Sequence, residues 1–93
     1  MGPLSPEEIA RKLSALGGWI LTPQGIQKRY EMGNFLSAMN LVNRAADLAE
    51  QAQHHPDIFI SYDKVTFTLT THDAGGITQK DLDLAARIEA IAP

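Results

Sequence analysis

The sequence predicts an α+β fold of order α-β-β-α-β-β-α, with a four-stranded, mostly antiparallel sheet and helices packed on one face. Stretches near the start, in the middle and at the end of the chain carry apolar residues at helical spacing. Between them stand two pairs of short stretches with strand-like alternation, and turn-forming residues join each pair. The β-β-α unit therefore occurs twice.

The first helix is predicted to begin after Ser5 and to stop at Gly17-Gly18. Ser5 can cap the first turn, Pro6 suits the first helical position, and Glu8 completes a capping box. The glycines end the helical pattern. The buried face is predicted to comprise Ile9, Leu13 and Leu16.

Residues 19–21 and 26–32 are predicted to be the two strands of a hairpin whose turn spans residues 22–25. Pro23 and Gly25 make this turn recognisable because both are strong turn formers. The second strand alternates between two faces, with Ile26, Lys28 and Tyr30 on one and Gln27, Arg29 and Glu31 on the other.

A long central helix is predicted to follow, with Asn34 as its N-cap and Pro56 beyond its end. Its many alanines would let it lie close to the sheet. Glu50 falls in its last turn. The apolar stripe is predicted to consist of Phe35, Ala38, Met39, Val42, Ala46 and Ala49, widened by Leu41, Ala45, Leu48 and Ala52.

The second strand pair is predicted at residues 57–62 and 65–71, with Asp63-Lys64 as the connection. The later strand has the clearest alternation in the chain, which places Val65, Phe67, Leu69 and Thr71 on one face and Thr66, Thr68, Thr70 and His72 on the other. His72 is therefore predicted to end the polar row of this strand.

The last helix is predicted to begin at Thr78, after a loop at residues 73–76 that contains two glycines. Asp81 lies three residues beyond Thr78, where it can complete a second capping box. The buried face is predicted to comprise Leu84, Ala85, Ile88 and either Ile91 or Ala92.

Length and charge limit the possible functions. The 93 residues predict one domain, spanning residues 1–93, with a modest core that oligomerisation would supplement. The net charge is −3 and no basic block occurs, so direct nucleic-acid binding is disfavoured.

The residue composition and the pattern of apolar residues limit the possible functions further. The chain has no cysteine, which excludes disulfides, thiolate chemistry and cysteine-based zinc sites. No apolar run approaches the roughly 20 residues that a membrane helix needs. The start of the chain lacks the features of a signal peptide, so a cytoplasmic location is expected.

The three histidines form the most informative group. His54 and His55 are adjacent, and His72 follows on the next predicted strand. Glu50 precedes the pair by one helical turn, and Asp81 stands just inside the last helix. The predicted topology therefore brings these residues to one polar site. Histidine can both give and take a proton near neutral pH.

Three interpretations of this site remain open. The histidines can be solvated or capping residues. They can hold zinc, although adjacent histidines tend to point in different directions and no H-E-x-x-H helix is present. They can act as a proton donor and a proton acceptor on opposite sides of a substrate, which would drive an elimination of water without a cofactor.

The neighbouring residues have simpler interpretations as well. Asp81 can serve as a helix cap and nothing more. Glu50, which lies one turn from His54, can be a solvated residue or can orient an imidazole. Tyr62 shares a predicted strand face with apolar neighbours, which favours packing. Pro56 is predicted to fix the loop that aims His55.

A fixed spacing joins these residues: Glu50, His54-His55-Pro56, Tyr62, His72 and Asp81. The pattern closely resembles the signature of the pterin-4a-carbinolamine dehydratase family. Residues 71–81 resemble the family's second block, residues 35–46 its central helix, and Trp19 its early tryptophan. The likeness extends from about Ser5 to Ile91.

The resemblance implies a hydro-lyase that dehydrates 4a-hydroxytetrahydropterin to quinonoid dihydropterin, within tetrahydrobiopterin recycling. It implies no metal or organic cofactor and a homodimer or homotetramer. The family's catalytic histidines correspond to His54, His55 and His72. We expect His55 or His54 to face the hydroxyl and His72 to assist proton removal, and the split between acid and base stays open. Residues expected to bind or orient the substrate are Glu50, Pro56, Asp57, Thr71 and Asp81.

The resemblance also implies an alternative and includes two departures. Animal members act as dimerisation cofactors for a homeodomain transcription factor, so a non-catalytic assembly role with a protein partner is the rival function. Ile58 stands where many members carry tryptophan, and Lys80 stands where some carry arginine. Either change can alter contacts with the substrate, and neither removes an acid or a base.

Overall fold

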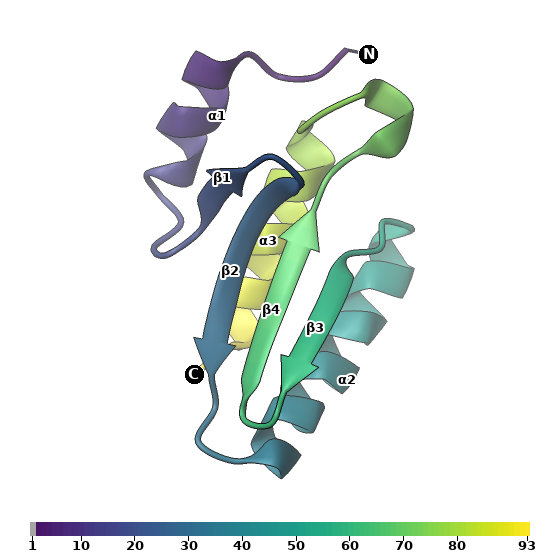
Figure 1. Cartoon of the computed structure of the whole chain (residues 1–93). Helices are drawn as coiled ribbons and strands as arrows, with labels where there is room; N and C mark the ends of the chain where they lie inside the picture. The colour runs from purple at the N-terminus through teal and green to yellow at the C-terminus, as the bar shows by residue number, and fades with distance from the viewer. Residues whose placement is uncertain (1) are drawn as a thin grey trace.

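The computed structural model describes residues 2–93, and its elements follow the predicted order (Figure 1). They are α1 (Pro6–Leu13), β1 (Ile20–Thr22), β2 (Gly25–Glu31), α2 (Phe35–Ala52), β3 (Asp57–Ser61), β4 (Lys64–Leu69), the short 3-10 helix η1 (His72–Ala74) and α3 (Gln79–Ile91). The predicted α+β fold is confirmed.

The four strands form one sheet in the order β1-β2-β4-β3, and every neighbouring pair is antiparallel. Tyr30 of β2 lies opposite Val65 of β4, and Ile58 of β3 lies opposite Phe67. Directly opposite residues share a face, so this register gathers the apolar side chains on one side of the sheet. The helices α2 and α3 lie behind that side, and α1 lies beside β1 (Figure 1).

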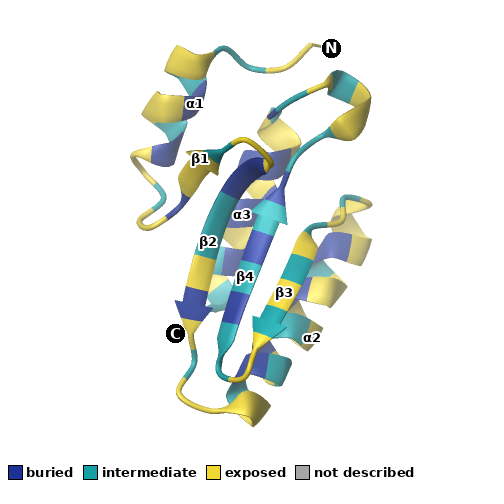
Figure 2. Ribbon diagram, in the orientation of Figure 1, coloured by how far each residue is buried: buried dark blue, intermediate teal, exposed yellow. Residues whose placement is uncertain are grey.

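The core lies between the sheet and the helices. Val65, Phe67 and Leu69 are completely buried, as the alternation along β4 predicts, and the pattern shows as alternating colours on this strand (Figure 2). On β2, Ile26 and Tyr30 are buried on the same side. On α3, the predicted buried face is confirmed by the burial of Leu84, Ala85 and Ile88.

The buried stripe of α2 is rotated from the predicted one. Its fully buried members are Ala38, Leu41, Ala45 and Ala49. Phe35 is 51% exposed, and Ala46 and Ala52 are also exposed, so the prediction that these three residues belong to the core is wrong. Small side chains lie nearest the sheet because they let the helix axis approach it, and this steric preference outweighs the hydrophobicity of Phe35.

Two boundaries in the first part of the chain also differ from prediction. The helix α1 ends at Leu13, before Gly17-Gly18, because tight turn bonds replace helical ones. Leu16 N–H donates to the carbonyl of Leu13 at 2.9 Å, and Trp19 N–H donates to that of Leu16 at 3.2 Å. Trp19 therefore precedes β1 and packs into the core with only 4% exposure.

The connection between β3 and β4 is a two-residue turn formed by Tyr62 and Asp63. Ser61 pairs with Lys64, which closes the hairpin, and Tyr62 adopts a positive φ of 53°. A tight hairpin turn commonly requires positive φ. Tyr62 is consequently 67% exposed, and the prediction that it packs on the strand face of Ile58 is wrong.

A polar cluster around Glu89 ties the first hairpin to α3. The Glu89 carboxylate accepts hydrogen bonds from the Tyr30 hydroxyl at 2.5 Å, the Lys28 ammonium at 2.8 Å and the Trp19 indole at 3.3 Å. Burial raises the pKa of Tyr30, and the hydrogen bond to Glu89 adds to this effect. Partial burial acts to raise the pKa of Glu89, but the hydrogen bonds from Lys28 and Tyr30 and the charge of Lys28 outweigh it, so this pKa is lowered.

Glu89→Gln is expected to lower the free energy of unfolding at neutral pH by about 1 kcal/mol, since it removes the charge that Lys28 faces. A lowered folded-state pKa means that ionised Glu89 stabilises the fold above its unfolded value, about 4.3, and that this contribution is lost as the pH falls further. Urea unfolding at several pH values should therefore show the difference between variant and wild type shrinking in acid. A difference that stays constant with pH would contradict this linkage, and Glu31→Gln is the exposed control.

None of the helices within residues 2–93 combines the length and the apolar character that crossing a membrane requires.

Candidate active site

The site lies at the end of the sheet where α2 ends, β3 begins and α3 begins. The helix α2 stops at Gln53, which adopts a left-handed backbone with φ 50°. His54 N–H then donates to the carbonyl of Ala49 at 3.1 Å, which satisfies one of the last carbonyls of the helix. His54 and His55 therefore occupy a hydrogen-bonded connection, and Pro56 leads directly into β3.

The His54 imidazole is held by a buried carboxylate. His54 Nε2 lies 2.5 Å from Asp81 Oδ1, and the His54 side chain is only 11% exposed. Asp81 is completely buried. Its Oδ2 accepts a hydrogen bond from the Thr78 backbone N–H at 2.9 Å and one from the Thr71 hydroxyl at 2.8 Å. Asp81 thus caps α3 and orients His54 at the same time.

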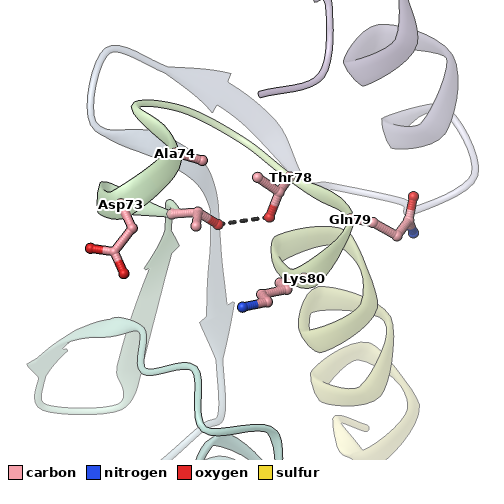
Figure 3. A pocket seen from close by; sticks show the side chains of 6 residues that line it. Asp73, Ala74, Thr78, Gln79 and Lys80 are labelled. Atoms are coloured by element: carbon pink, nitrogen blue, oxygen red, sulfur yellow. Dashed lines mark hydrogen bonds between the residues drawn. The ribbon is translucent and has the colours of Figure 1, made fainter. Parts of the chain in front are cut away.

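The hydroxyl groups around Asp81 form a directed chain. Thr71 has one hydroxyl hydrogen, and it is donated to Asp81. The Thr78 hydroxyl, 2.8 Å from that of Thr71, must then donate to Thr71 (Figure 3). An ionised carboxylate only accepts hydrogen bonds, so the remaining partner, His54 Nε2, carries a proton. We therefore assign to neutral His54 the tautomer with its proton on Nε2 and a lone pair on Nδ1.

The second histidine has a different environment. His55 Nε2 contacts the Glu50 carboxylate, and the two side chains are 60% and 70% exposed. Glu50 thus orients an imidazole, as one of its predicted roles has it, and that imidazole belongs to His55 and not to His54. The left-handed turn at Gln53 explains the difference, because it redirects the chain so that His54 reaches α3 while His55 stays above the last turn of α2.

The third histidine does not end a strand. The strand β4 stops at Leu69, and His72 begins η1, so the prediction that it ends the polar row is wrong. A β-bridge between Thr71 and Gly76 closes the loop that contains η1. His72 nevertheless borders the same cleft as the histidine pair. The cleft has a volume of about 300 Å³ and is lined by Gln53, His54, His55, Thr70, Thr71, His72, Asp73 and Lys80.

The other predicted site residues differ in whether they reach this cleft. Glu50 and Asp81 reach it through His55 and His54 respectively. Asp57 borders a separate cavity of about 430 Å³ on another side of His72, together with Gln24 of the first hairpin turn. Pro56 lines neither space. Within the described part of the chain, no group of three or more histidine, aspartate or glutamate residues is arranged to hold a metal ion.

Sequence reasoning missed several lining residues. Gln53, Asp73 and Lys80 border the cleft but were not among the predicted site residues. Each is the immediate sequence neighbour of a predicted site residue, so adjacency in the sequence was the signal that could have identified it. Thr70 could have been found from its place on the polar face of the later strand.

Comparison with known proteins identifies the family of the chain. The family model described as Pterin 4 alpha carbinolamine dehydratase matches residues 2–91. The chain belongs to this family. The resemblance drawn from the spacing of the histidines is therefore confirmed.

Individual members of the dehydratase family are similar along nearly the whole chain. A protein of Acidobacterium capsulatum named "Putative pterin-4-alpha-carbinolamine dehydratase" is 48% identical over 91 residues, which cover 98% of this chain and 99% of that protein. A protein of the same name from Nostoc sp. is 51% identical over 88 residues, covering 95% of each chain.

Solved structures of the pterin dehydratase type share the fold. The transcriptional coactivator/pterin dehydratase from Brucella melitensis superposes with a TM-score of 0.94 at 33% identity and covers 99% of this chain and 100% of its own. A pterin dehydratase-like protein described as a RuBisCO assembly factor in the alpha-carboxysome superposes with a TM-score of 0.62 at 25% identity, covering 77% of this chain and 83% of its own.

Proposed function

We propose that the chain is a hydro-lyase that dehydrates 4a-hydroxytetrahydropterin to quinonoid dihydropterin, and that it serves tetrahydrobiopterin recycling in the cytoplasm. The observation that carries this proposal is the arrangement of three imidazoles around one cleft, two of them paired with carboxylates. Membership of the pterin carbinolamine dehydratase family supports it.

The reaction needs one proton donor and one proton acceptor. The bond between C4a and the hydroxyl oxygen breaks, and the departing oxygen takes a proton and leaves as water. The neighbouring ring nitrogen loses its proton, and its electron pair forms the new double bond to C4a. Atoms and charge balance without any change in oxidation state, so two positioned imidazoles supply all that the step requires.

The hydrogen bonds favour one division of roles. His54 Nε2 is committed to Asp81, so its unprotonated Nδ1 can accept a proton but cannot give one. We assign His54 to remove the proton from the ring nitrogen. His55 is exposed to solvent and its Nε2 contacts the Glu50 carboxylate, so a protonated His55 can keep that contact while it donates its Nδ1 proton to the departing hydroxyl. We assign His55 as the acid, and His72 as the group that assists proton removal from the opposite side of the cleft.

His55→Ala and His72→Ala test the proposal in a stopped assay with synthetic 4a-hydroxytetrahydropterin. Each variant is expected to lower the catalysed rate roughly 100-fold, the low end for one acid–base group, because solvent can reach these exposed positions. Arg87→Ala, on the surface of α3, is the control and should keep the wild-type rate. Equal rates for wild type and both histidine variants would defeat the catalytic assignment.

A second candidate function is a non-catalytic dimerisation or assembly role. Two structural relatives, a transcriptional coactivator/pterin dehydratase and a RuBisCO assembly factor, support this candidate. Exposed apolar side chains supply surface for association: Phe35 and Leu36 begin α2 at 51% and 71% exposure, and Phe59 on β3 is 67% exposed. We propose a homodimer or homotetramer, which the mass measured by light scattering would test against the 10.2 kDa of one chain.

A further inference from the structure

The η1 loop, which comprises residues 70–78 between β4 and α3, carries the least supported of the three imidazoles. His54 and His55 each contact a carboxylate, whereas the His72 side chain forms no hydrogen bond or ion pair with any of residues 2–93. Its position therefore depends on the backbone of the loop, which contains two consecutive glycines. Glycine loses more conformational freedom on folding than any other residue, so a loop of this composition needs contacts from outside to keep a side chain in place.

Backbone hydrogen bonds close the η1 loop at its base. Thr71 N–H donates to the carbonyl of Gly76 at 3.0 Å, and Gly76 N–H donates to that of Thr71 at 3.3 Å. The Thr71 hydroxyl is held in turn by Asp81. One side of the base is thus anchored within the site, and Gly76 and Ile77 form the other side.

The N-terminal segment, residues 2–5, supports this other side of the base (Figure 1). Leu4 N–H donates to the carbonyl of Ile77 at 2.8 Å, and the Leu4 side chain packs against the core. Farther along, the Lys12 ammonium of α1 donates to the Gln79 side chain at 2.9 Å. These contacts hold the end of the loop against the first part of the chain.

The N-terminal segment passes so close to Gly76 that a side chain there would collide with it. A Cβ atom on Gly76 would lie 2.9 Å from Pro3 Cβ and 3.5 Å from Pro3 Cγ. Apart from its chain neighbours, no other residue among 2–93 would come within 4 Å of that atom. The φ of Gly76 is not positive, so its backbone conformation does not require glycine. The close passage of Pro3 does require it.

We propose that the N-terminal segment is a positioning element for His72, and that its contacts with the η1 loop keep this imidazole at the cleft. The contacts are those of Pro3 with Gly76 and of Leu4 with Ile77. The proposal rests on the proposed function, since it gives the segment a part in proton removal. Pro3 and Leu4 do not line the cleft, so they act through the backbone of the loop as positioning residues.

Gly76→Ala tests the contact by adding one methyl group. The methyl carbon would meet Pro3 more closely than two carbon atoms can approach without repulsion, so it should displace the segment and break the bond between Leu4 and Ile77. With 4a-hydroxytetrahydropterin, kcat is expected to fall about fivefold, the equivalent of one neutral hydrogen bond. KM should stay close to the wild-type value, because the other lining residues keep their places. Gly17→Ala is the control, since it adds the same group where no atom of residues 2–93 beyond its chain neighbours lies within 4 Å, and it should keep the wild-type kcat.

A second substitution separates the N-terminal segment from the loop itself. Pro3→Gly removes the side chain that the new methyl group would meet. Gly76→Ala should therefore lower kcat far less in the Pro3→Gly background than in wild type. An equal loss in both backgrounds would overturn the proposal, because the methyl group would then act within the loop alone.

NMR of the protein without substrate tests the positioning separately from the reaction. In Gly76→Ala, the Leu4 amide should lose its protection against hydrogen exchange and the ring signals of His72 should shift, whereas those of His55 should stay in place. Unchanged His72 signals would overturn the proposal. Retained protection of Leu4 would overturn it as well, because the contact would then tolerate a methyl group. If these signals respond as expected but wild type does not dehydrate the pterin, the proposed reaction fails and the positioning of His72 stands.

Discussion

Asp81→Asn is expected to lower the rate of dehydration on the order of 10³-fold while preserving the fold. The asparagine oxygen can still accept from Thr71 and Thr78, which leaves its amide group facing His54. An amide donor forces His54 Nε2 to become an acceptor, so the ring proton moves to Nδ1. His54 can then no longer take a proton through Nδ1. Comparable losses arise elsewhere when a carboxylate that fixes a catalytic imidazole is replaced by its amide.

Three measurements on this variant distinguish a change in the His54 tautomer from a general loss of folding. The rate is measured with synthetic 4a-hydroxytetrahydropterin, the His54 tautomer by the nitrogen chemical shifts of its ring, and the free energy of unfolding by urea. Stability should fall by about 1–3 kcal/mol, because one hydrogen bond of a buried group changes. Asp83→Asn makes the same change at an exposed position of α3 and should leave rate and tautomer unaltered. A normal rate with a changed tautomer would contradict the role given to His54.

His54→Gln and His54→Ala are expected to separate catalysis from stability. Glutamine can place its amide N–H near the position of Nε2 and continue to donate to Asp81, but it cannot accept a proton. His54→Gln should therefore lower the rate on the order of 10³-fold and change the free energy of unfolding little. His54→Ala leaves the buried Asp81 carboxylate without its partner and should cost about 3 kcal/mol in addition.

The comparison requires both rate measurements and urea unfolding of the two variants. A glutamine variant that dehydrates at the wild-type rate would contradict the role given to His54. An alanine variant as stable as the glutamine variant would contradict the energetic role given to the buried pair.

The fold was predictable because its rules are local. Alternation along residues 65–69 assigned the buried side of the central strand, and Ser5 and Asp81 marked helix starts through side-chain caps that the structure contains. The ends of elements were less predictable. Gly17-Gly18 suggested where α1 stops, but the helix already ends at Leu13. The three residues before the glycines form tight turns, because their shorter-range backbone hydrogen bonds compete with the helical ones.

The site was predictable in its members and less so in their pairing. The positions of the histidines indicated a shared rim, and the structure brings all three to one cleft. The pairing of Glu50 with His55 depends on the left-handed backbone of Gln53, a residue type that gives no advance sign of this conformation. The hydroxyl chain through Thr71 and Thr78 depends on segments that meet only after folding, so chain spacing did not reveal it.

In the proposed mechanism the three imidazoles act on one pterin ring. Nitrogen-detected NMR of the histidine rings during titration with an unreactive oxidised pterin tests it most directly. The account predicts that the signals of His54, His55 and His72 all shift and reach half of their change at the same pterin concentration. A titration in which only one ring responds, or in which the rings respond with different affinities, would contradict it.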